Sequence, residues 1–241
     1  MTDISSYVEG QSAANLLLNP EAMNKGGDDQ IFQWFTRCLE AKKSGRDVVN
    51  GTLGSMLNDQ GNLAINNTVE RQIRGQPSIE LSGYSPLRGL PPFRDLAIEL
   101  ALGPNRQAIE ESGISAVSMA TPGGCGALSA SASNFVDTGD KILLRSRHWG
   151  PYETIIEEHG CKIATWPLLP ETPEAGLEHL ERAGLAAGIA TLAQSQKRVL
   201  IWLNDPAHNP TGLSLQASER RAVLEEVWEH ALSFPEVGIT L

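Results

Sequence analysis

From about residue 114 onward, short apolar runs alternate with longer segments of helical periodicity. The apolar runs predict strands at residues 114–120, 141–146, 161–168, 198–204 and 237–241. The intervening segments space their apolar residues as amphipathic helices do, and predict helices at residues 127–136, 151–160, 172–186 and 214–232. Gly160 is expected to end the second of these helices. This alternation predicts an α/β fold, with a mostly parallel sheet and helices on both faces.

The first quarter of the chain is less regular. Its pattern predicts one helix at residues 29–45, and a glycine-rich stretch follows at residues 50–61. We therefore expect an N-terminal arm with a segment of a smaller domain at residues 1–63, and a large domain at residues 64–241. Because the last residues resemble the opening of another buried strand, the large domain is expected to be incomplete at its C-terminal end.

Charge and cysteine usage narrow the possible partners. The 241 residues carry a formal net charge of −10, whereas a general nucleic-acid binder needs a basic face. Cys38, Cys125 and Cys161 have unrelated spacings that fit neither a disulfide framework nor a metal site. We expect a small-molecule ligand, no nucleic-acid partner, no metal and a reducing compartment.

The sequence also argues against membrane insertion or export. The first 23 residues contain acidic side chains, lack a basic stretch and have only a short apolar run. No segment reaches the roughly 20 consecutive apolar residues that a membrane span needs. A cytoplasmic location with no membrane partner is therefore expected.

Residues 121–126, with sequence TPGGCG, precede the first helix of the predicted βαβ unit. Gly123, Gly124 and Gly126 leave backbone N–H groups accessible at the helix N-terminus, where the helix dipole favours an anion. A phosphate group suits such a site. The alternative is a tight turn that binds nothing, because glycine serves turns in general.

Two further loops follow predicted strands, at the edge where open α/β sheets bind ligands. In the first, SRHWG at 146–150, Trp149 offers a face for stacking on a planar ring, although a lone tryptophan also suits a core position. In the second, NDPAHNPTG at 204–212, Asn209 precedes Pro210, which favours a cis or extended peptide and a fixed side-chain amide. An ordinary Asn-Pro turn is the alternative for this loop.

Taken together, the motifs resemble class I aminotransferases, the fold-type I enzymes that use pyridoxal 5′-phosphate. AHNPTG is similar to the family's Asn-Pro-Thr-Gly signature, and GGCGAL to its phosphate loop. HWG resembles the Trp-Gly of the aspartate and aromatic branch. GYSPLRGLPPFRDLA resembles a further segment of the family, and NGTLGSMLNDQGN resembles a segment of that branch. The resemblance runs from about Val48 to the last residue.

The resemblance implies specific roles for individual residues. Gly123, Gly124 and Cys125 would hold the phosphate of pyridoxal 5′-phosphate. Trp149 would stack on the ring, and Asn209 would donate a hydrogen bond to the ring's phenolic oxygen. Both would also border the substrate.

Two other residues complete the implied site. Tyr84 would reach the phosphate bound by a partner subunit, which implies a homodimer with shared active sites. Gly54 would lie beside the substrate carboxylate.

Three departures from the family pattern stand out. Cys125 replaces a Ser or Thr and so offers a weak S–H donor in place of a hydroxyl. Arg147 and His148 replace the usual pair before the aromatic position. The family's Schiff-base lysine and the aspartate that pairs with the pyridine nitrogen are absent, and none of the lysines stands in a Ser-x-x-Lys context: Lys25, Lys42, Lys43, Lys141, Lys162 and Lys197.

The resemblance therefore implies an enzyme of amino acid metabolism that moves an amino group between an amino acid and a 2-oxo acid. The 241-residue chain is expected to be inactive alone and to contain no catalytic residue of its own. Two alternatives remain open: a lyase or decarboxylase that uses the same cofactor and fold, and a lysine-less relative with a binding or regulatory role.

Overall fold

The structure, a computed structural model, describes Asn19, residues 30–52 and residues 54–241. The N-terminal segment used to argue against a targeting signal lies outside these residues, apart from Asn19, as does Lys25. The chain divides into two compact units, Met1–Gly83 and Tyr84–Leu241. The domain boundary expected near residue 63 stays a prediction.

The described part of the first unit combines helices with irregular segments. It contains α4 (Gln30–Lys43), α5 (Asn67–Gly75) and α6 (Ser78–Ser82). The helix expected at 29–45 is therefore present as α4. Asn66 begins α5, because its side-chain oxygen accepts hydrogen bonds from the backbone N–H groups of Thr68 and Val69.

The second unit is built around a parallel sheet. Its four strands are β1 (Lys141–Arg145), β2 (Lys162–Trp166), β3 (Arg198–Trp202) and β4 (Gly238–Thr240). They lie in the order β2-β1-β3-β4, and every neighbouring pair is parallel. In the register of the central pair, Leu144 lies opposite Trp202.

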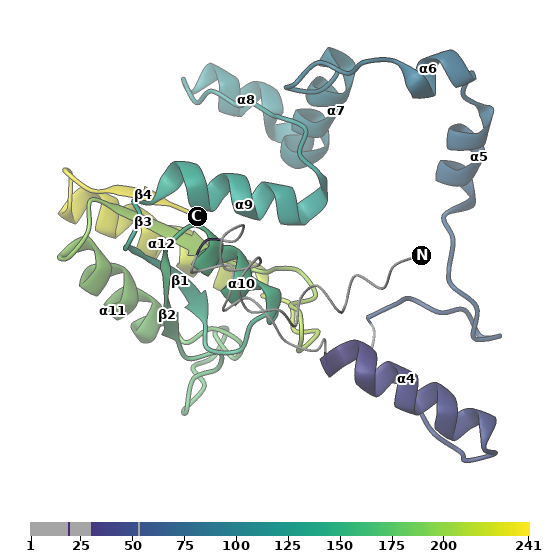
Figure 1. Cartoon of the computed structure of the whole chain (residues 1–241). Coiled ribbons are helices and arrows are strands. Elements are labelled where there is room, and N and C mark those ends of the chain that lie inside the picture. The colour runs from purple at the N-terminus through teal and green to yellow at the C-terminus, as the bar shows by residue number, and fades with distance from the viewer. Residues whose placement is uncertain (1–18, 20–29, 53) are drawn as a thin grey trace. The chain divides into compact units, whose positions relative to one another are not determined.

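Helices cover both faces of this sheet (Figure 1). On one face, α9 (Gly123–Phe135) and α10 (Pro151–Glu158) pack over Ile142, Leu144, Leu200 and Trp202. On the other, α11 (Arg182–Ala193) and α12 (Ala217–Ser233) pack over Leu143, Val199 and Ile201. Successive strand residues thus point to opposite apolar layers, and the continuous apolar runs of β1 and β3 are explained.

The predicted strand at residues 114–120 is wrong. This segment is extended but belongs to no strand, and it bonds instead to the region before it: Ala120 N–H donates to Arg88 O at 3.1 Å, and Ser118 Oγ donates to Arg94 O at 2.7 Å. Three short helices precede it, α7 (Pro91–Leu102), the 3₁₀ helix η1 (Gly103–Asn105) and α8 (Arg106–Glu111). The alternating polarity of residues 114–120 predicted an extended backbone, but it did not specify which segment would pair with it.

The predicted helix at residues 172–186 begins too early. Residues 172–181 form turns, and α11 starts at Arg182 because the Glu181 side chain accepts a hydrogen bond from Gly184 N–H. Its Ala- and Gly-rich sequence is apolar on all sides, which hid the helix from a search for an amphipathic stripe. The end of α10 was predicted correctly, since Gly160 follows it at a φ of +68°.

Candidate functional site

The N-terminus of α9 presents backbone donors to solvent. Gly123 has a φ of +65°, and its N–H donates to Thr121 O at 2.7 Å, which turns the chain into the helix. Gly126 N–H donates to Pro122 O at 3.3 Å, so the N–H groups of Gly124 and Cys125 precede the first intrahelical bond. Both residues are exposed. This end of α9 can therefore receive an anion.

Trp149 lies in the loop between β1 and α10. Its ring is partly buried and packs against the apolar cluster that includes Tyr152 and Trp202. The rings of Trp149 and Tyr152 form a T-shaped pair, with centroids 5.7 Å apart. Trp149 is thus partly a packing residue and partly available at the surface. His148 is a loop anchor, because its Nδ1 lies 3.0 Å from Arg145 O and its Nε2 lies 3.2 Å from Glu153 Oε1.

Asn209 stands at the tip of a closed loop after β3. Below it, the two sides of the loop are joined by hydrogen bonds from Ala207 N–H to Ser214 Oγ and from His208 N–H to Leu213 O, at 2.9 and 2.7 Å. The Asn209–Pro210 peptide bond is cis, one of the two forms expected from the sequence. The Asn209 side chain is exposed, so its amide is accessible to a ligand.

Charged groups brace the base of this loop. The Asp205 carboxylate accepts from Leu215 N–H and from Arg220 Nε, both at 2.7 Å. Burial raises the pKa of the Asp205 carboxyl, but these two hydrogen bonds, together with the positive charges of Arg220 and Arg145, hold that pKa below its usual range. Arg145, only 2% exposed, donates through Nη2 to His179 O. Burial lowers the pKa of the Arg145 guanidinium, and the charges of Glu219 and Asp205 oppose that shift.

The strand order brings the two loops to one edge of the sheet. Since β1 and β3 are parallel neighbours, the Trp149 loop and the Asn209 loop both leave from their carboxyl ends. The C-terminus of α9 leads into the start of β1, so its N-terminus faces the same edge. Tyr84 is exposed at the start of this unit, and Gly54 belongs to the first unit. Their roles stay predictions.

A family comparison covers all three of these elements. The family described as aminotransferase class I and II matches residues 46–233. The chain belongs to this family. The resemblance to class I aminotransferases drawn from the sequence motifs is thereby confirmed.

Known aminotransferases align with most of the chain. The aromatic-amino-acid aminotransferase of Escherichia coli (strain K12) is 26% identical over 204 residues, which are 82% of this chain and 48% of that protein. An aromatic-amino-acid aminotransferase of Pseudomonas aeruginosa is 30% identical over 132 residues, 54% of this chain and 30% of that protein. The chain spans about half the length of the Escherichia coli relative.

Solved structures agree on the fold. The crystal structure of an aminotransferase from Anaerococcus prevotii has a TM-score of 0.78 at 26% identity, covering 90% of this chain and 51% of that one. The cytoplasmic aspartate aminotransferase of Saccharomyces cerevisiae has a TM-score of 0.65 at 22% identity, covering 85% of this chain and 48% of that one. The predicted fold class, the α/β fold of these transferases, is confirmed.

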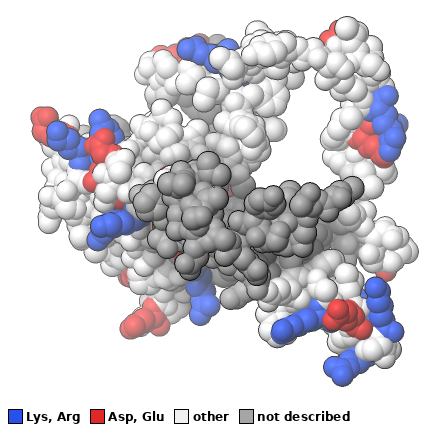
Figure 2. Space-filling model, in the orientation of Figure 1, with Lys and Arg blue, Asp and Glu red and all other residues white. Residues whose placement is uncertain are grey.

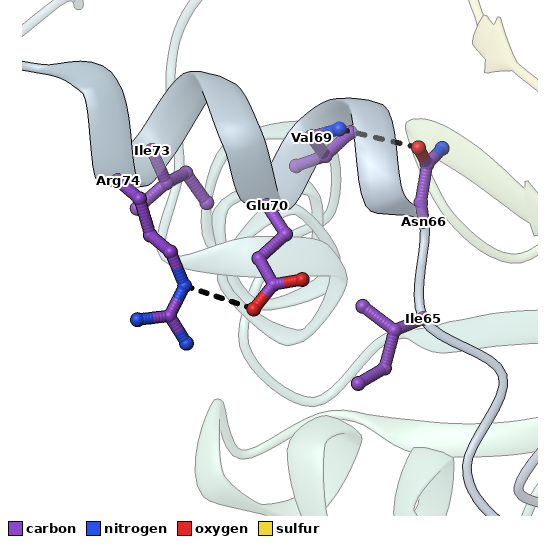
Figure 3. Close-up of a pocket in the computed structure, with 6 residues that line it drawn as sticks. All are labelled: Ile65, Asn66, Val69, Glu70, Ile73 and Arg74. Carbon is purple, nitrogen blue, oxygen red and sulfur yellow. Dashed lines mark hydrogen bonds and ion pairs between the residues drawn. The ribbon is translucent and has the colours of Figure 1, made fainter.

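The chain also has a groove in its first unit. It has a volume of 450 Å³ and runs along α5 beside Ile65, Val69 and Ile73. Figure 3 shows Glu70 and Arg74 together at its border, joined by an ion pair of 2.9 Å. None of the predicted site residues lines this groove.

On the face drawn in Figure 2, basic and acidic side chains lie beside one another rather than in patches of one sign. Within the described ranges, no helix is long and apolar enough to cross a membrane. The same residues contain no group of three or more His, Cys, Asp or Glu side chains suited to hold a metal ion.

The sequence analysis did not identify three polar side chains on the elements that lead to the candidate site. Tyr152, Ser131 and Arg145 carry no family signature and sit on ordinary helices and strands. Each of them is buried or partly buried although it carries a polar group. Such groups need buried partners, and only the tertiary structure shows which ones.

Proposed function

We propose that this aminotransferase binds pyridoxal 5′-phosphate at the carboxyl edge of the sheet and that the whole protein transfers an amino group from an amino acid to a 2-oxo acid. The observation that carries the proposal is the convergence of the α9 N-terminus, Trp149 and Asn209 on that edge. A helix N-terminus, an aromatic face and an amide donor match a phosphate, a flat ring and a phenolic oxygen.

Each residue has a separate role in this proposal. The N–H groups of Gly124 and Cys125 hold the phosphate, and the Cys125 thiol adds only a weak donor. Trp149 stacks on the ring and keeps water from one face. Asn209 donates its amide N–H to the phenolic oxygen. When bound, the cofactor supplies a ring that accepts electrons from the substrate's Cα.

The partners follow from the same proposal. The substrates are an amino acid and a 2-oxo acid, and Gly54, Trp149 and Asn209 border them. Tyr84 contacts the phosphate in a second copy of the chain, which makes the protein a homodimer with shared sites. We retain the cytoplasm as the proposed location.

Binding of the cofactor by the purified chain tests the proposal. We expect non-covalent, weak binding, because no lysine stands in a Ser-x-x-Lys context. The measurement is quenching of tryptophan fluorescence by pyridoxal 5′-phosphate, followed by borohydride reduction and location of pyridoxyl groups by peptide mass. Trace labelling scattered over surface lysines agrees with the proposal. One stoichiometric adduct on a single lysine would show that the chain carries its own Schiff-base residue.

Product analysis separates the alternatives. Incubation of the chain with cofactor and an amino acid, with and without a 2-oxo acid, distinguishes amino transfer from elimination or decarboxylation. We expect no turnover by this chain alone. Tight cofactor binding with no turnover in any longer form of the protein would favour the lysine-less binding or regulatory role.

A further inference from the structure

Tyr152 lies behind the proposed cofactor site and contacts two of its elements. It is the second residue of α10 and is 8% exposed. The Asn204 side-chain amide donates to its hydroxyl at 3.1 Å. Asn204 is the first residue of the loop that carries Asn209, so the Tyr152 hydroxyl is bonded directly to that loop.

The ring of Tyr152 joins the remaining two parts of the site. It forms T-shaped pairs with the rings of Trp149 and Trp202, and the centroid separations are 5.7 and 5.2 Å. Trp202 in turn donates from its indole Nε1 to Ser131 Oγ on α9 at 3.0 Å. One connected set of side chains therefore links the helix that starts at the phosphate loop, the Trp149 ring and the Asn209 loop.

The hydroxyl of Tyr152 is not needed for packing. A phenylalanine would fill the same space and keep both ring contacts. A buried phenol needs a hydrogen-bond partner, and here that partner lies at the start of a loop whose tip is exposed. The bond therefore fixes the loop relative to the ring of Trp149.

We propose that Tyr152 is a positioning residue that holds the Trp149 ring and the Asn204–Gly212 loop in the arrangement needed to bind the cofactor. This inference rests on the proposed function. Tyr152 acts through Trp149 and Asn209, and its ring and its hydroxyl contribute separately. The ring orients Trp149, and the hydroxyl orients the loop.

The test uses the full chain with the variant Tyr152→Phe, which removes only the hydroxyl. Pyridoxamine 5′-phosphate is the probe, because it does not label surface lysines, and its dissociation constant is measured by tryptophan quenching. Loss of one hydrogen bond predicts binding weaker by about three- to tenfold. Asn204→Ala should weaken binding similarly, and the double variant should add little to either single change.

Two serines of α9 provide a matched comparison. Ser131 and Ser133 both donate to carbonyls of their own helix, to Leu128 O and Ala130 O, but only Ser131 also accepts from Trp202. Ser131→Ala should weaken binding of the probe, and Ser133→Ala should leave it unchanged. Near-UV circular dichroism of the bound probe should fall in Tyr152→Phe, a change that a loss of stability alone does not produce.

A measurement without ligand tests the positioning role of Tyr152 separately from the proposed cofactor binding. Amide hydrogen exchange of residues 204–212 should accelerate in Tyr152→Phe and not in Ser133→Ala. If Tyr152→Phe changes neither the dissociation constant nor the exchange rates, the proposal is wrong and Tyr152 serves only in packing. If the parent chain does not bind the probe at all, the proposed function fails, and the exchange rates alone decide whether Tyr152 orders the loop.

Discussion

At the scale of single residues, the buried imidazole of His208 contacts Thr211 within the loop that carries Asn209. It is 2% exposed, and its Nδ1 lies 2.8 Å from Thr211 Oγ1. Burial lowers its pKa, and the nearby positive charge of Arg145 lowers it further. His208 therefore stays neutral in the folded chain under conditions that protonate an exposed histidine.

Acidification should therefore destabilise the chain through His208. The unfolded state binds the proton first, so this stabilising contribution is present above the unfolded pKa of about 6.5 and is lost as the pH falls below it. Urea unfolding at about pH 7.5 and about pH 5.5 measures the loss. His208→Gln should show a smaller difference between the two conditions, and an equal difference would contradict the assignment.

Asn209 should leave a spectral signature if it bonds the cofactor. Replacing it by alanine removes a donor to the phenolic oxygen, which should raise the pKa of that oxygen and shift the pH dependence of the bound cofactor's absorbance. A spectral pH titration checks this. Asn105→Ala serves as the control, since Asn105 is exposed and does not cap α8 through its side chain. Overlapping titrations of Asn209→Ala and the parent would make Asn209 a turn residue.

At the scale of elements, the glycines that begin α9 differ in what surrounds them. A Cβ at Gly126 would lie 2.6 Å from Pro122 Cδ, whereas a Cβ at Gly124 would meet nothing within 4 Å. Gly126 is required by the close approach of the proline that precedes the helix. Gly124 is free of that constraint.

The two alanine variants should therefore diverge. Gly126→Ala should lower the free energy of unfolding by about 1–3 kcal/mol, because the proline must move. Gly124→Ala should be neutral or raise it by about 0.4–1 kcal/mol, through reduced freedom of the unfolded chain. Denaturant unfolding of both variants decides. Equal destabilisation would show that the helix start does not depend on this contact.

The elements that sequence patterns predicted well are those whose cause is local. β1, β3 and α12 follow from apolar runs and periodicity within their own residues. Residues 114–120 were misassigned because a strand exists only if a neighbour pairs with it, and here Arg88 and Arg94 provide the partners instead. Tyr152 escaped prediction for the same reason, because its partner Asn204 is brought to it by the parallel pairing of β1 and β3.

At the scale of the whole molecule, many large apolar side chains are exposed between residues 31 and 119. Tyr84 is 94% exposed, Leu87 90% and Leu100 88%. An isolated soluble chain rarely shows so much apolar surface without a partner for it. The motifs identified the family, but one chain's sequence does not specify which surfaces another chain covers.

The isolated chain should therefore associate with itself or bind hydrophobic dyes. Light scattering coupled to gel filtration at several concentrations measures the association, and a fluorescent apolar probe reports the exposed surface. A double variant, Leu87→Gln with Leu100→Gln, should reduce both signals. A monodisperse monomer that binds no dye would contradict the exposure of these side chains in solution.

The position of β1 between β2 and β3 also determines the order in which the strands can pair during synthesis. A ribosome makes β1 first and β2 soon after, and these two strands pair directly. The other edge of β1 has no partner until α11 and β3 have been made. At roughly 5–20 residues per second, an apolar strand edge therefore stays open for seconds during synthesis. We expect a nascent chain of this protein to be a substrate for chaperones that recognise unpaired strands.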